Sequence, residues 1–238
     1  MKRRLGLPVV LGALVVAGCA PGKQQDGGAR TAERSTAMQN QTSDLARKLT
    51  SGAYGEFFVL PAHDQTVERI WADPANRPAL EALTADAGQP LAARFLAAEV
   101  LFARDVTFTT RLPGGVIADI YAHALEQNLT GMANSWGLLY ELDDAGPVGI
   151  RFVMLGEAAV PALVRLLDNA GAPLIYDGSK EATVGNAYHY RIKDFAAFYL
   201  GRIRRIPVTF HRELPERDQE IARLKQQLAA QPAASKTP

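Results

Sequence analysis

The chain has 238 residues and a nearly balanced charge, with 26 Lys and Arg against 25 Asp and Glu and a formal net charge of +1. This balance excludes the strongly basic footprint that is typical of nucleic-acid-binding domains. The single cysteine, Cys19, has no second thiol with which to form a disulfide, so packing alone must hold the fold. Residues 43–230 are numerous enough for one domain with a sizeable core.

The first residues have the pattern of an export signal. Lys2, Arg3 and Arg4 precede an apolar stretch at 5–16 that is interrupted only by glycine and one proline. A helix needs about 20 apolar residues to span a bilayer, so this stretch is too short. The pattern predicts a signal peptide over residues 1–18 that is removed from the mature protein.

The end of this segment, Val16-Ala17-Gly18-Cys19, resembles the lipobox of bacterial lipoproteins. The resemblance implies transfer of diacylglycerol to the Cys19 thiol, cleavage before Cys19 and acylation of the new amine. Several acyl chains then anchor the protein, since each buried CH₂ contributes about 0.8 kcal/mol. Ala20, where an Asp would imply inner-membrane retention, implies the outer membrane, with the domain facing the periplasm. The alternative is an ordinary secretory signal or an apolar first helix.

Two terminal segments lack the composition of a folded domain. Residues 19–42 are rich in Gly, Gln, Ser, Thr and Ala and have almost no large apolar side chains, which predicts a flexible, disordered tether after the lipidated cysteine. Residues 231–238 are predicted to form a disordered tail. Removal of the three basic residues of the signal peptide leaves 23 Lys and Arg against 25 Asp and Glu, or a net charge of −2.

Between these segments the spacing of apolar residues is mostly helical. In the segment 91–104, for example, Leu91, Phe95 and Phe102 fall on one face of a helix. A stretch rich in Gly, Asn and Asp at 130–149 interrupts the series. In chain order, the predicted helices are 64–71, 77–85, 91–104, 116–128, 157–168, 191–204 and 216–230.

Two of these segments resemble the paired helices of a HEAT-type repeat, with 156–168 as the first helix and 191–203 as the second. Apolar residues recur at intervals of three and four in both, and residues 91–101 resemble an earlier second helix. The resemblance implies stacked helical hairpins that bury their apolar faces together, although the period is irregular. The predicted fold class is therefore all-α, a short HEAT-like α-solenoid or a helical bundle, with an irregular Gly-rich insertion.

The insertion at 176–191 contains two strong turn signals, Asp177-Gly178 and Gly185-Asn186, and has aromatic residues at both ends. A loop of this length between helices is uncommon and often functional. One interpretation is a binding loop, and the other is that its tyrosines fold back and pack on the helices. The residues that a binding loop would present to a partner are Tyr176, Tyr188, His189, Tyr190 and Arg191.

No sequence motif for catalysis or metal binding stands out. No two of the four histidines lie within five residues of each other, so no zinc-ligand spacing such as H-E-x-x-H is present. There is also no nucleophile elbow, phosphate-binding loop or dinucleotide fingerprint. We therefore expect no catalytic residues, no metal and no cofactor. The alternative is an envelope hydrolase whose site comprises Asp177, Glu181, Tyr188 and His189.

Together these patterns predict a non-catalytic, lipid-anchored periplasmic module at the cell envelope that binds another protein or serves as a scaffold. Extended helical-repeat surfaces commonly bind partners, although a fold alone does not establish a function. The expected partners are the membrane, through the N-terminal lipid, and another protein. Nucleic acid is not an expected partner.

Overall fold

The computed structural model describes residues 26–59, 63–139 and 145–231. The described residues before Met38 belong to one compact unit, and those from Met38 onward belong to a second. Cys19, the lipobox and the predicted signal peptide lie outside the described residues, as does all but the first residue of the predicted tail.

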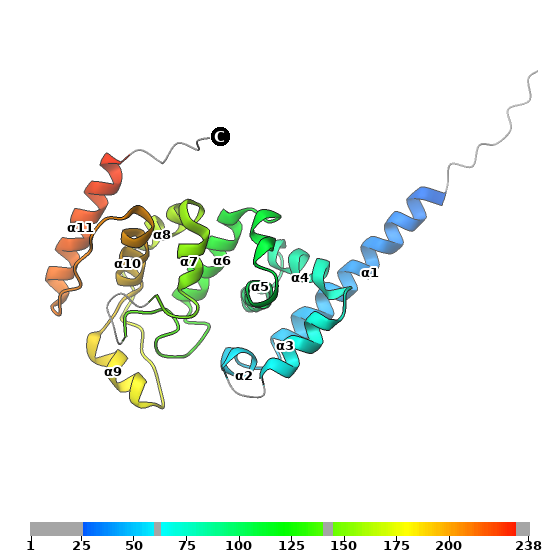
Figure 1. Cartoon of the computed structure of the whole chain (residues 1–238), viewed down its shortest axis with the longest axis horizontal. Helices are drawn as coiled ribbons and strands as arrows, with labels where there is room; N and C mark the ends of the chain where they lie inside the picture. The colour runs from blue at the N-terminus through cyan, green and yellow to red at the C-terminus, as the bar shows by residue number, and fades with distance from the viewer. Residues whose placement is uncertain (1–25, 60–62, 140–144, 232–238) are drawn as a thin grey trace, which may run out of the picture. The chain divides into compact units, whose positions relative to one another are not determined.

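Every element in the described ranges is helical and none is a strand, which confirms the all-α prediction (Figure 1). Two elements are short 3-10 helices, η1 (Val106–Thr110) and η2 (Gly156–Ala159). The α-helices are α1 (Asp26–Leu49), α2 (Tyr54–Phe58), α3 (His63–Ala72), α4 (Asn76–Ala85), α5 (Leu91–Arg104), α6 (Gly114–Glu126), α7 (Ile150–Leu155), α8 (Val160–Leu166), α9 (Lys180–Tyr188), α10 (Ile192–Arg204) and α11 (Leu214–Ala230).

Helix α1 corrects the prediction of a disordered tether, because residues 26–42 are helical. That prediction rested on the lack of large apolar side chains, but Ala, Arg, Glu, Gln and Met have high helix propensity whether or not they are buried. Within the second unit, Leu45 and Leu49 of α1 are buried, and Gln41 Nε2 donates a 2.5 Å hydrogen bond to Asn76 Oδ1. The last part of α1 therefore belongs to the folded core.

The strongly periodic helices lie where the sequence places them. Helix α5 begins and ends at the predicted residues, and α4 and α10 begin within one residue of theirs. The predicted helix 157–168 is instead divided into η2 and α8, because Pro161 has no amide to donate and favours the first turn of a new helix. Helices α2, α7 and α9 lie outside all predicted helices.

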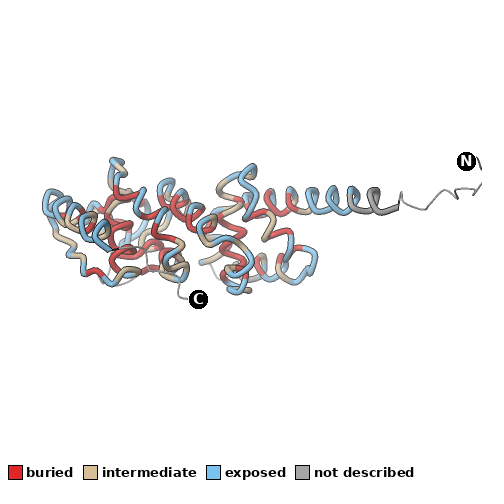
Figure 2. Tube along the Cα trace, turned by 90° about the horizontal axis from the view of Figure 1, so that it is seen from above, coloured by how far each residue is buried: buried red, intermediate tan, exposed pale blue. Residues whose placement is uncertain are grey.

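Successive helices pack against one another through the second unit. Helix α4 contacts α5, α5 contacts α6, α6 contacts α8, α8 contacts α10, and α10 contacts α11 (Figure 1). Helices α4, α6, α8 and α11 each have a buried face and an exposed face, whereas residues 95–102 of α5 and 194–201 of α10 are buried throughout (Figure 2). The two segments that resemble a HEAT pair, which form α8 and α10, do contact each other.

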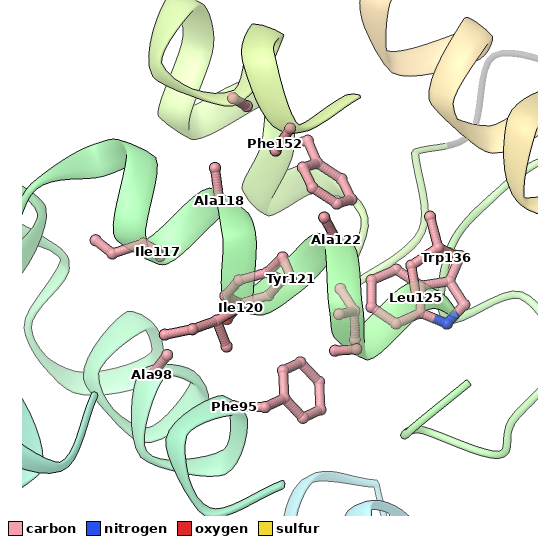
Figure 3. Close-up of a cluster of buried hydrophobic side chains, with 14 of the residues drawn as sticks. Phe95, Ala98, Ile117, Ala118, Ile120, Tyr121, Ala122, Leu125, Trp136 and Phe152 are labelled. Carbon is pink, nitrogen blue, oxygen red and sulfur yellow. The ribbon is translucent and has the colours of Figure 1, made fainter. Parts of the chain in front are cut away.

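Large aromatic side chains fill the centre of this stack (Figure 3). Phe95 of α5 and Phe152 of α7 each meet Tyr121 of α6 edge to face, with ring centroids 5.4 and 6.2 Å apart. Trp136, from the irregular segment between α6 and α7, is fully buried against both phenylalanines. The glycine-rich segment at 130–149 therefore contributes to the core as well as connecting two helices.

Helix α10 approaches this segment closely at Gly149. A Cβ atom at position 149 would lie 1.7 Å from the hydroxyl oxygen of Tyr199, so only glycine fits there. The Tyr199 hydroxyl lies within hydrogen-bond distance of two carbonyls, that of Trp136 at 2.5 Å and that of Ala145. Tyr199 thus attaches α10 to the residues that precede α7.

Two carboxylates are buried in the described part of the chain, Glu99 on α5 and Asp194 on α10. Glu99 accepts hydrogen bonds from the Tyr54 hydroxyl at 3.0 Å, from the Tyr121 hydroxyl, and from Arg151 Nε at 3.1 Å. Burial, and then the charge of Glu99, raises the pKa of both tyrosines far above the ordinary value, so both hydroxyls remain protonated donors at neutral pH. Glu99 therefore joins α5 to α2, α6 and α7.

Candidate functional site

The predicted insertion is not wholly irregular, because it contains helix α9. Ser179 caps this helix, since its hydroxyl accepts a 3.1 Å hydrogen bond from the Ala182 amide. His189 ends the helix in the left-handed conformation, with a φ of 51°. A capping serine followed by Lys, Glu and Ala is the sequence signal that identifies this helix.

Gly185 and Asn186, interpreted from the sequence as turn residues, instead attach α9 to the chain that precedes it. The Asn186 side chain donates to the Tyr176 carbonyl at 2.8 Å and accepts from the Tyr176 amide at 2.9 Å. A Cβ atom at position 185 would lie 3.3 Å from the Tyr176 ring, so glycine lets that ring pack against the helix. The burial that results raises the pKa of the Tyr176 hydroxyl well above its ordinary value.

Of the five residues predicted to contact a partner, Tyr176, Tyr190 and Arg191 are buried. The alternative interpretation, in which the tyrosines pack on the helices, is what the structure shows for Tyr176 and Tyr190. Tyr188 and His189 are exposed, with 43% of Tyr188 accessible to solvent. The binding-loop interpretation therefore fits the positions of Tyr188 and His189 only.

Arg191 holds helices together. Its guanidinium forms two bonds to Asp194, of 2.9 and 3.1 Å, and an ion pair of 2.9 Å with Asp218. Asp194 also accepts a 2.9 Å hydrogen bond from the Arg191 amide at the start of α10. Arg217 of α11 reaches the same carboxylate at 2.8 Å and donates to the Tyr188 carbonyl at 2.8 Å. This ionic cluster therefore connects α10, α11 and the end of α9.

Tyr188 lines a groove of about 520 Å³, which we call the aromatic groove. The rings of Tyr188 and Tyr190 stack with centroids 5.4 Å apart and planes inclined by 11°, and Phe210 meets Tyr190 edge-on at 6.4 Å. Apolar side chains of α9 line the same groove, and Arg212 gives it a basic edge beside His211, which lies 3.3 Å from Glu216. The groove thus combines a rigid aromatic surface with donors of hydrogen bonds.

Phe210 forms part of one wall of the aromatic groove and ends the segment 206–210, which lies between α10 and α11 and outside every predicted helix. Glu220 Oε1 accepts a 2.8 Å hydrogen bond from the Thr209 amide, and Arg223 donates a 2.5 Å bond to the Pro207 carbonyl. Glu220 and Arg223 are themselves paired at 2.6 Å. Helix α11 therefore holds this wall in place.

Acidification is expected to weaken this attachment. The hydrogen bond from Arg223, opposed in part by burial, lowers the pKa of Glu220 from 4.5 to about 2. Because the folded-state pKa is the lower one, the carboxylate stabilises the fold fully above about pH 4.5 and loses this effect as the pH falls toward 2. The difference in free energy of unfolding between the wild type and Glu220→Gln, measured by urea denaturation, should shrink across this range. A difference that does not change with pH would contradict the assignment.

The four residues of the alternative hydrolase site, Asp177, Glu181, Tyr188 and His189, all have exposed side chains, and only Tyr188 lines the aromatic groove. Within the described ranges, no three His, Cys, Asp or Glu side chains are grouped so that they could hold a metal ion. None of the described helices has the length and apolar character that crossing a membrane requires.

Comparisons of this chain with protein-family models, with curated proteins and with solved structures found no match. Its function must therefore be argued from its own residues.

Proposed function

We propose that this chain is a lipid-anchored module of a bacterial cell envelope that binds another protein through the aromatic groove. The observation that carries the proposal is the exposed Tyr188 ring, which is fixed by stacking on the buried Tyr190 beside Phe210. Tyrosine and arginine are enriched among the residues that dominate protein interfaces, and the basic edge supplies Arg212. A ring that is already ordered loses little entropy on binding.

The anchor in this proposal rests on the lipobox-like sequence that ends at Cys19, and Ala20 favours the outer membrane with the domain in the periplasm. The scaffold role rests on the succession of packed helices, including α8 against α10, which is the arrangement expected of HEAT-like hairpins. Such stacked helices present extended surfaces to partners.

The proposal predicts two results in bacterial cells that produce the chain. The Cys19→Ser variant should no longer incorporate labelled fatty acid, because it has no thiol to acylate. A photo-crosslinking amino acid in place of Tyr188 should give a discrete adduct with one protein of the envelope. The matched control carries the same amino acid at Met154, which is 47% exposed on α7 and lies outside the groove.

The two readouts separate the two parts of the proposal. Fatty-acid labelling that persists in Cys19→Ser, or that is absent from the wild type, would refute the lipid anchor at Cys19. Adducts of equal yield from positions 188 and 154 would refute a specific role for the groove. Phe210→Ala, checked for folding by circular dichroism, should lower the yield from position 188, since Phe210 borders the Tyr190 ring on which Tyr188 stacks.

A further inference from the structure

The segment 206–210, Ile-Pro-Val-Thr-Phe, has the features of a β-strand within a helical domain. It runs without helix, turn or bend and is therefore extended. Alternate residues, Ile206, Val208 and Phe210, are buried or half-buried, and the two residues between them are exposed. A strand that covers a core with one face has this alternation. No strand lies beside the segment in the described part of the chain.

One backbone edge of this segment is bonded to α11, and the other is open at Val208 and Phe210. The edge that carries the Pro207 carbonyl and the Thr209 amide is bonded to α11. In an extended chain, alternate residues direct their amides and carbonyls to opposite edges, so Ile206, Val208 and Phe210 share the second edge. Among the described residues, the backbone amides and carbonyls of Val208 and Phe210 have no hydrogen-bond partner. Two amides and two carbonyls are therefore available to a further strand.

A hollow of about 580 Å³ lies along the segment, beside the end of α10. Phe198 and Gly201 line it, together with Arg202 and Arg205, and it shares Phe210 with the aromatic groove. The Ile206 amide bonds to the Gly201 carbonyl, so the open edge is on the α10 side of the segment, where the hollow lies. The hollow, the open edge and the aromatic groove thus form one continuous surface.

This surface is basic, although the chain as a whole is nearly neutral. Residues 202–212 contain four arginines and one histidine, with no Asp or Glu. Arg204 is paired with Glu157 at 2.8 Å, and His211 lies 3.3 Å from Glu216. Arg205 and Arg212 have no carboxylate partner among the residues that the structure describes. Their uncompensated charge favours carboxylates on whatever covers the surface.

We propose that the segment 206–210 accepts an extended acidic peptide of a partner protein as an added strand. This refinement rests on the proposed protein-binding function. The backbone of the peptide would bond to Val208 and Phe210, and its carboxylates would meet Arg205 and Arg212. Its apolar side chains, on alternate residues, would enter the hollow and the aromatic groove.

The charge of the surface favours an acidic peptide over two other possible occupants, a second copy of the chain and the chain's own residues 232–238. A second copy of the chain, paired edge to edge, would bring arginines close to arginines, which is unfavourable. The chain's own residues 232–238 contain one lysine and no Asp or Glu, so they do not complement the basic surface. An acidic segment of a different protein is therefore the occupant that the surface favours.

The test uses a fluorescent, end-blocked peptide of alternating Val and Glu residues, titrated into the full chain at low ionic strength. We expect saturable binding in fluorescence anisotropy, weakened by added salt. N-methylation of alternate peptide amides should weaken binding by about tenfold or more, because it removes the donors of the added strand. Replacement of every Glu of the peptide by Gln should weaken binding to a similar degree.

Variants of the protein supply the matched controls. Val208→Pro removes an amide of the open edge and should weaken peptide binding more than Val208→Ala, which trims the lining of the hollow but keeps the amide. The double variant Arg205→Gln with Arg212→Gln should also weaken binding, whereas Arg165→Gln, at a 49% exposed arginine elsewhere on the surface, should not. If Val208→Pro fails to fold, the N-methylated peptide still decides the question, because it leaves the protein unchanged.

Several results would overturn the inference. One is that the Val–Glu peptide does not bind to the folded chain. The others are that the N-methylated peptide or the Gln peptide binds with the same affinity as the Val–Glu peptide. A dimer in light scattering that Val208→Pro abolishes would assign the edge to a second copy instead. If the Tyr188 adduct in cells survives Val208→Pro, the proposed function stands and the added strand fails.

Discussion

Replacement of Glu99 by alanine is expected to lower the free energy of unfolding by about 3–5 kcal/mol, the usual cost of removing one partner from a buried ion pair. Glu99 is only 2% exposed and receives hydrogen bonds from Tyr54, Tyr121 and Arg151. Its loss leaves the arginine, whose side chain is 19% exposed, without a counter-charge and leaves two hydroxyls without an acceptor. The cost is large because four helices meet at this single carboxylate.

Urea denaturation followed by circular dichroism measures this loss. Glu68→Ala is the control, since Glu68 pairs with Arg104 at 2.5 Å but is 55% exposed, and it should cost at most about 1 kcal/mol. Glu99→Gln keeps the shape and one acceptor and should fall between the two. Equal losses for Glu99→Ala and Glu68→Ala would mean that the buried cluster does not stabilise the fold.

Replacement of Asp194 by alanine is expected to have an effect of the same size, about 3–5 kcal/mol. Asp194 is fully buried, and the change leaves the guanidinium groups of Arg191 and Arg217 without their shared carboxylate. Because Arg217 also bonds to the Tyr188 carbonyl, the end of α9 should loosen together with α11. Faster amide hydrogen exchange in α9 and α11 than in α5 should accompany the loss of stability.

Asp218→Ala is the control for this variant. Asp218 pairs with Arg191 and Lys193 but is 47% exposed, so its removal should change stability by at most about 1 kcal/mol. Hydrogen exchange that rises uniformly over all helices in Asp194→Ala would show that the cluster acts on global stability alone. Local loosening of α9 and α11 would show that it positions the aromatic groove.

The helices that could be predicted from the sequence are those in which periodicity and burial agree. Helix α5 has a clear apolar face and matches its prediction at both ends. Residues 26–42 were predicted to lack structure because few of them are apolar, yet their helix propensity is high. Helix α9 was not predicted, because Gly185-Asn186 has the pattern of a turn. In the structure both residues lie within the helix and contact Tyr176, which precedes it.

The candidate site could be predicted only in part. The aromatic residues around α9 were recognised, but which of them are buried depends on α10 and α11, and no local pattern records those long-range contacts. The segment 206–210, which contributes Phe210 to the groove, lies outside every element predicted from the sequence. The sequence does contain its alternation of apolar and other residues and the arginines around it. A prediction made of helices alone assigns no role to this pattern.

The close approach of Gly149 and Tyr199 restricts which residues can replace Gly149. A side chain at position 149 would collide with the tyrosine hydroxyl and also with ring carbon Cζ, 2.5 Å away, so phenylalanine at 199 would not relieve the conflict. A smaller residue at 199 would still leave the Ala145 carbonyl oxygen 2.6 Å from that Cβ atom, so position 149 can acquire a side chain only if the backbone also shifts. Two separate contacts, one from α10 and one from the chain before α7, therefore restrict position 149 to glycine.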